Sequence, residues 1–100
     1  MSSLPELQAK IKLARRRFQA RPDSRDFAPL ADLLREAGQY REALLILDKG
    51  LRKFPRYVTG FVIKGRTLNE AGYGELGQEA LKKALTLDPQ NILALDLLIG

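Results

Sequence analysis

The chain has 100 residues, of which 45% are hydrophobic and 29% charged, and its formal net charge is +5. This length suits one domain with a modest core, and the composition excludes wholesale disorder. Cysteine and histidine are both absent, which excludes disulfides, thiolate or imidazole metal sites, and catalysis by either residue. No apolar run approaches the roughly 20 residues of a membrane span, and the first residues lack a signal-peptide pattern. We therefore expect a cytoplasmic protein that has no membrane partner.

The first predicted element is a helix over residues 4–20. Ser3 and Glu6 have the spacing of a capping box, with Pro5 in the first helical turn. Apolar residues then recur at intervals of three and four and predict one apolar stripe: Leu4, Leu7, Ile11, Ala14 and Phe18. Pro22 ends this helix because proline cannot continue the hydrogen-bond ladder.

A helix pair follows. The second predicted helix begins near Ser24 or Asp26 and ends before Gly38. The third covers residues 40–53 and ends before Pro55, with small and large apolar residues alternating along its inward side.

The same order of elements then returns. We expect a fourth helix over 58–70, a turn at 72–74 and a fifth helix over 75–86. Asn91 is a favourable N-cap for a sixth helix. No segment shows strand-like alternation, so the sequence predicts an all-α array of antiparallel helix pairs.

Much of the chain recurs at a spacing of 34 residues. Glu36-Ala37-Gly38 returns as Glu70-Ala71-Gly72. Other residues return at the same spacing: Phe27 as Phe61, Leu34 as Leu68, Leu47 as Leu81, Leu51 as Leu85 and Pro55 as Pro89. Repetition at one fixed spacing is typical of stacked units, each too small to bury its own apolar face.

These units resemble the tetratricopeptide repeat, which combines two helices of alternating large and small residues with a closing proline. Its small positions are matched by Ala31 and Gly65, Ala43 and Gly77, and Gly50 and Ala84. The resemblance divides a single domain into an N-terminal half-repeat helix at 4–20, repeats at 24–57 and 58–91, and the start of a third repeat at 92–100. Such a chain is either a segment of a longer array or a small protein that caps itself.

The resemblance implies a tetratricopeptide-like, right-handed superhelical array of about six helices. It also implies a protein–protein interaction scaffold with no cofactor and no catalytic residues. The second repeat departs from the pattern at Lys64, Gly74 and Gly77. A glycine inside a helix costs about 1 kcal/mol, so we expect the second repeat to be the looser one.

In this family the first helix of each pair lines a concave groove that receives peptides or helices of partner proteins. The candidate groove residues, which lie opposite the core stripe, are Arg25, Asp32, Arg35, Thr59, Val62, Arg66 and Asn69. Arg35, Arg66 and Asn69 are expected to pair with carboxylates or peptide carbonyls, and Val62 to supply apolar contact. The alternative for each single residue is an ordinary solvated helix face.

The positive charge is concentrated at the start of the chain. Residues 1–25 contain seven basic and two acidic residues, whereas residues 26–100 contain ten of each. Lys10, Arg17 and Arg21 share one side of the predicted first helix and form a candidate basic face. Binding of an acidic polymer such as nucleic acid is the alternative function. No aromatic residues interleave for base stacking, so the pattern favours a solvated outer face.

The last segment is apolar around the whole predicted helix. The residues of this candidate self-association edge are Leu93, Leu95, Leu97, Leu98 and Ile99. A following helix, a partner or a second copy would each cover them. Self-association, giving a homo-oligomer, is the hypothesis that we favour.

Residues 72–77 also match the dinucleotide-binding pattern G-x-G-x-x-G. That motif requires a preceding buried strand, where the turn directs helix N–H groups at a pyrophosphate. A predicted helix precedes it here, and Gly72 repeats Gly38. We therefore interpret the motif as a turn between helices.

Overall fold

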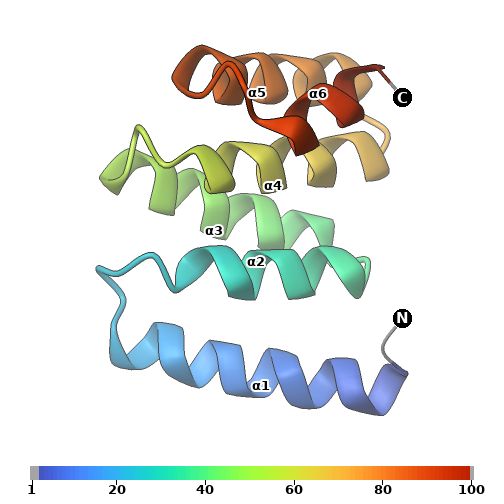
Figure 1. Cartoon of the computed structure of the whole chain (residues 1–100). Coiled ribbons are helices and arrows are strands. Elements are labelled where there is room, and N and C mark those ends of the chain that lie inside the picture. The colour runs from blue at the N-terminus through green and yellow to red at the C-terminus, as the bar shows by residue number, and fades with distance from the viewer. Residues whose placement is uncertain (1–2, 100) are drawn as a thin grey trace.

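The computed structural model describes residues 3–99, which form six α-helices stacked in chain order (Figure 1). The helices are α1 (Leu4–Ala20), α2 (Phe27–Glu36), α3 (Tyr40–Lys53), α4 (Val58–Glu70), α5 (Gly74–Leu87) and α6 (Ile92–Ile99). No strand occurs within this described range, and the predicted all-α architecture is confirmed. None of the helices in residues 3–99 combines the length and apolar character needed to cross a membrane.

The helices form two layers. Each helix packs against the next in sequence, and in addition α2 contacts α4 and α4 contacts α6. The backbones of α3 and α5 lie further apart. Because α2, α4 and α6 approach one another more closely than the helices of the other layer, the stack bends toward them. The surface of α2, α4 and α6 that faces away from α3 and α5 is named the inner face.

The structure confirms the two helix N-caps that the sequence predicts, Ser3 and Asn91. The backbone N–H of Glu6 donates a 3.3 Å hydrogen bond to Ser3 Oγ at the start of α1. At the start of α6, the N–H of Ala94 donates a 2.9 Å bond to Asn91 Oδ1. These bonds satisfy N–H groups that have no partner within a helix.

The two units turn in the same way between their helices. Gly38 and Gly72 have φ values of 75° and 94°, in the left-handed region that glycine adopts without strain. The residues that follow them, Gln39 and Tyr73, each donate a 2.8 Å backbone bond to the carbonyl five residues earlier. A helix precedes Gly72, so the glycine motif at 72–77 is a helix–helix turn, as expected.

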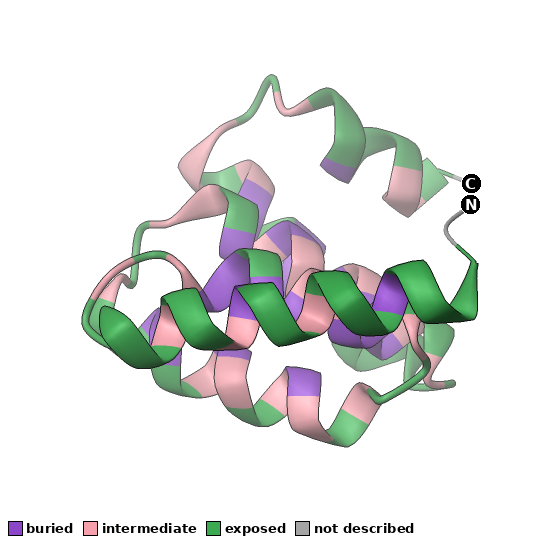
Figure 2. Ribbon diagram, turned by 90° about the horizontal axis from the view of Figure 1, so that it is seen from below, coloured by how far each residue is buried: buried purple, intermediate pink, exposed green. Residues whose placement is uncertain are grey.

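The core consists of two clusters. The larger lies between α1, α2 and α3 and is centred on Phe27, which is 1% exposed. The Phe27 ring lies 6.2 Å from that of Phe54 and 5.9 Å from that of Tyr57, measured between centroids. The smaller cluster joins α4, α5 and α6. Figure 2 shows that the outward side of α1 is mostly exposed, so α1 covers one end of the core.

The prediction of a looser second repeat is wrong, because α4 and α5 pack more closely than α2 and α3. A Cβ atom on Gly65 would lie 2.6 Å from Leu81 Cγ and 3.0 Å from the Gly77 carbonyl oxygen. The two glycines therefore allow the helix backbones to touch. Lys64 is also accommodated, since its Nζ lies 2.9 Å from Oδ1 of Asp48 on α3.

Candidate protein-interaction surface

Arg35, in the last turn of α2, joins α2 to the C-terminal end of α4. Its side chain is only 8% exposed. Nε donates a 2.9 Å hydrogen bond to Asp32 Oδ1, and Nη1 donates bonds of 3.1 and 3.0 Å to the two carboxylate oxygens of Glu70. Burial opposes the charged form, but the bonds and charges of Asp32 and Glu70 outweigh it and raise the pKa of Arg35. Arg35 is thus a permanent cation enclosed by two carboxylates.

Arg66 extends this group into a network of alternating charges. Its Nε lies 3.6 Å from Glu70 Oε2, one helical turn away on α4. Two arginines and two carboxylates neutralise one another. The prediction that Arg35 offers its guanidinium to a partner is therefore wrong, since two of its three nitrogens already donate within the fold. Glu70 is the member of this network that the sequence did not indicate, because its only sequence signal is the turn at Gly72.

The other candidate groove residues have different surroundings. Thr59 is exposed in the first turn of α4. Arg25 is exposed too, and its guanidinium carbon lies 5.0 Å from the ring centroid of Tyr57, a cation–π contact. Val62 is only 4% exposed and belongs to the smaller core cluster. Asn69 is half-buried, and its Oδ1 occupies the space where a side chain on Gly77 would begin.

The prediction that Val62 supplies apolar contact to a partner is therefore wrong, because the contact of α6 with α4 buries it. Asn69 is directed at α5 instead of the inner face. The structure brings together Asp32, Arg35 and Arg66, and it leaves Arg25 and Thr59 accessible. No sequence signal marked Val62 as buried, since its burial depends on where α6 packs.

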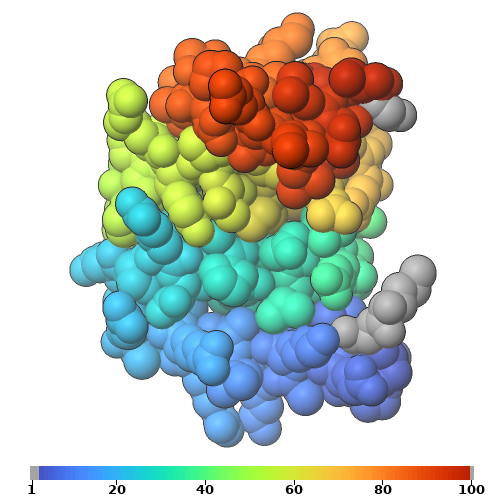
Figure 3. Space-filling model, viewed as in Figure 1, coloured from blue at the N-terminus to red at the C-terminus, as the bar shows by residue number. Residues whose placement is uncertain are grey.

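The predicted self-association edge is only partly exposed. Leu93, Leu95 and Ile99 are 47%, 38% and 84% exposed. Leu97 and Leu98 are half-buried and pack against the smaller core cluster. Figure 3 shows α6 as red atoms at one end of the stack. The exposed part of this edge is continued by Ile92, which is 73% exposed.

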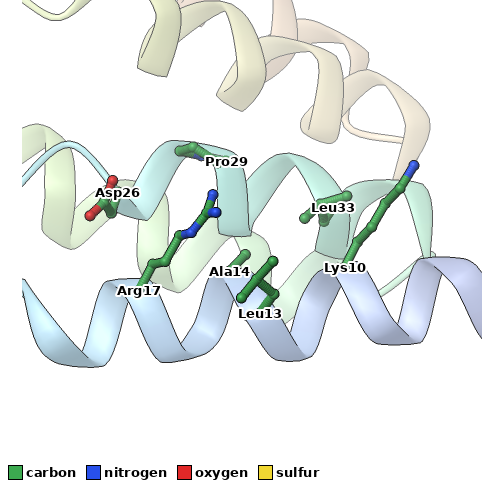
Figure 4. A pocket seen from close by; sticks show the side chains of 7 residues that line it. All are labelled: Lys10, Leu13, Ala14, Arg17, Asp26, Pro29 and Leu33. Atoms are coloured by element: carbon green, nitrogen blue, oxygen red, sulfur yellow. The ribbon is translucent and has the colours of Figure 1, made fainter.

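The predicted basic residues are all exposed: Lys10 and Arg17 on α1, and Arg21 directly after its end. Lys10 and Arg17 border an open pocket of ≈ 180 Å³ between α1 and α2 (Figure 4). The remaining residues of this α1–α2 pocket are Leu13, Ala14, Asp26, Pro29 and Leu33. Arg21 lies outside it. Within residues 3–99, no three acidic side chains group closely enough to hold a metal ion.

Arg15 makes a separate contact, to the helix beyond α2. Its Nη1 donates a 2.5 Å bond to Oε2 of Glu42 on α3. This hydrogen bond, together with the positive charge, lowers the pKa of Glu42. The bond links α1 to α3 and leaves Arg17 as the member of the arginine triplet that borders the pocket.

Comparison with solved structures decides the fold. The chain superposes on YrrB, a TPR protein with an unusual peptide-binding site, with a TM-score of 0.86. The match covers 93% of this chain and 48% of YrrB at 21% sequence identity. The chain has the tetratricopeptide-repeat fold. The resemblance drawn from the sequence is thereby confirmed.

Two curated relatives match a shorter stretch of the tetratricopeptide-repeat chain. It is 30% identical to the probable UDP-N-acetylglucosamine–peptide N-acetylglucosaminyltransferase SPINDLY of Solanum lycopersicum, and 32% identical to that of Petunia hybrida. Each match covers 73 residues, which are 73% of this chain and 8% of the relative. The similarity thus concerns a small part of these plant proteins. No family model matches the chain.

Proposed function

We propose that this tetratricopeptide-repeat chain is a protein-interaction scaffold, without catalytic activity of its own, whose inner face binds a peptide or helix of a partner protein. The observation that carries the proposal is the contact of α2 with α4 and of α4 with α6, which makes one continuous surface of three helices. The peptide-binding site of YrrB, which shares the fold, supports the same function.

The charge network defines what this surface offers a partner. Arg35 is already enclosed, so it holds α2 and α4 at a fixed spacing and pre-organises the surface. Arg66 and Glu70 are 40% and 36% exposed and present both charge signs. A partner of mixed charge, which hydrogen-bonds to both, suits this face better than a single terminal carboxylate does.

The test is recovery of partners on the immobilised chain from cells of the source organism, with identification by mass spectrometry. Thr59→Glu combined with Arg66→Glu alters two accessible positions of the inner face. Lys82→Glu combined with Thr86→Glu makes the same types of change at exposed positions of α5. We expect the first variant to lose partners that the wild type and the α5 variant retain. Equal recovery by all three proteins would refute the assignment of the inner face.

We also propose that the self-association edge of α6 binds a second copy of the chain. Three of its large apolar side chains, Leu93, Leu95 and Ile99, are exposed to water. Sedimentation at increasing concentration tests this proposal. Leu93→Ser with Ile99→Ser is expected to weaken the association, and Leu45→Ser, at a 63% exposed position of α3, is the control. A wild-type chain that remains monomeric at high micromolar concentration would contradict it.

A further inference from the structure

One repeat later, a helix occupies the position that is equivalent to the α1–α2 pocket. There, α2 packs against one stripe of α4. Ile63, Thr67 and Glu70 form the stripe of α4 that faces α2, as the bond of Glu70 to Arg35 shows. Thr67 is fully buried there. The equivalent residues of α2, 34 positions earlier, include Pro29 and Leu33.

That stripe of α2 is open. Pro29 is exposed and Leu33 only half-buried, because no further helix of residues 3–99 lies over them. Together with residues of α1 they line the open α1–α2 pocket. The lining residues of α1 run from Lys10 to Arg17, which is two helical turns or about 10 Å.

The lining of the α1–α2 pocket is apolar in the middle and basic at the sides. Leu13, 51% exposed, lies beside Ala14 on α1 and opposite Leu33 on α2. Figure 4 shows Lys10 and Arg17 extending from α1 toward α2 on either side of Leu13. Arg21, exposed directly after the end of α1, adds a positive charge beyond Arg17 but outside the pocket. Asp26 is the acidic residue of the lining.

We propose that the α1–α2 pocket binds an acidic amphipathic helix of a partner protein. The apolar stripe of that helix packs on Leu13, Ala14 and Leu33, and its flanking carboxylates pair with Lys10 and Arg17. The inference goes beyond the inner-face function and does not rest on it, since the pocket uses a different stripe of α2.

Charge complementarity decides between this occupant and a second copy of the chain. Helix α6 of a second copy carries one carboxylate, Asp96, among apolar side chains. The lining of the pocket has two cations, Lys10 and Arg17, and one acidic residue, Asp26. Around it, the first 25 residues contain seven basic and two acidic residues. Desolvating these cations against leucine would be costly, so a helix with several acidic residues fits better.

The test uses a fluorescein-labelled synthetic peptide with leucines at helical spacings of three and four and glutamates on both sides of that stripe. Its binding to the 100-residue chain is measured by fluorescence anisotropy. We expect Leu13→Ala to raise Kd about tenfold, because the leucine surface leaves water on binding. Arg17→Glu should raise Kd about fivefold at low salt and less at high salt.

Matched controls keep the same chemistry outside the pocket. Leu45→Ala changes an exposed leucine on α3, and Arg16→Glu reverses the neighbouring exposed charge on α1. Both are expected to leave Kd unchanged. All four positions are exposed, so circular dichroism should report a native fold for each variant.

Three results would overturn the proposal. One is a Kd that neither Leu13→Ala nor Arg17→Glu alters. Another is equal binding of a peptide with glutamine in place of every glutamate, which would remove the requirement for acidic groups. The third is a chain that does not bind the peptide but self-associates, with the self-association abolished by Leu13→Ala and also by Asp96→Asn. That result would assign the pocket to a second copy.

Discussion

Gly50, near the C-terminal end of α3, is where an added methyl group would collide with the core. A Cβ atom there would lie 2.3 to 2.4 Å from three ring atoms of Phe27. The ring cannot retreat easily, because it is 1% exposed and packs against the rings of Phe54 and Tyr57. Gly50→Ala should therefore destabilise the fold, although alanine is the better helix former.

The size of the effect follows from two opposing contributions. Replacing glycine by alanine inside a helix contributes about 1 kcal/mol of stability. Overpacking a core costs about 1–3 kcal/mol, and three short contacts with a rigid ring place this variant near the upper value. The expected net loss is about 2 kcal/mol, which lowers the Tm by about 8–16 °C for a domain of this size.

Gly74→Ala is the matched control. Gly74 is the first residue of α5, and an added Cβ there has no atom within 4 Å. This change should be neutral or stabilise by up to about 1 kcal/mol. Urea unfolding followed by far-UV circular dichroism measures both variants. A Gly50→Ala protein as stable as the wild type would refute the reasoning from close helix approach.

Three further predictions concern polar contacts. Arg35→Met should cost about 2 kcal/mol in urea unfolding, because it leaves the carboxylate of Glu70 without its buried donor; an unchanged midpoint would contradict this. Glu42→Gln should cost less than about 1 kcal/mol at neutral pH, since the bond to Arg15 is partly exposed. Because that bond lowers the folded-state pKa of Glu42 below 4.5, its contribution is present above pH 4.5 and is lost as the pH falls through the folded-state pKa; thermal melts of wild type and variant should converge in acid. Asn91→Ala should cost about 1 kcal/mol and speed amide exchange in α6; identical exchange would argue against the cap.

The sequence by itself determined the helices, their order and the repeat. Its signals there are local: Ser3 and Asn91 cap the helices that follow them, and Gly38 and Gly72 supply left-handed turns. The 34-residue recurrence then requires that both units fold in the same way. Hydrogen bonds between residues that are close in sequence fix these features, so the sequence alone predicts them.

The tertiary structure decided what each helix surface faces. Arg35 meets Glu70 across 35 residues, and Val62 is buried because α6 packs over it. Gly65, which costs stability in an isolated helix, instead allows α4 and α5 to touch. These outcomes depend on the distance and angle between helices, and the packing of many side chains together sets that geometry. For this reason the sequence identified a repeat scaffold, while the structure separated enclosed side chains from those that can contact a partner.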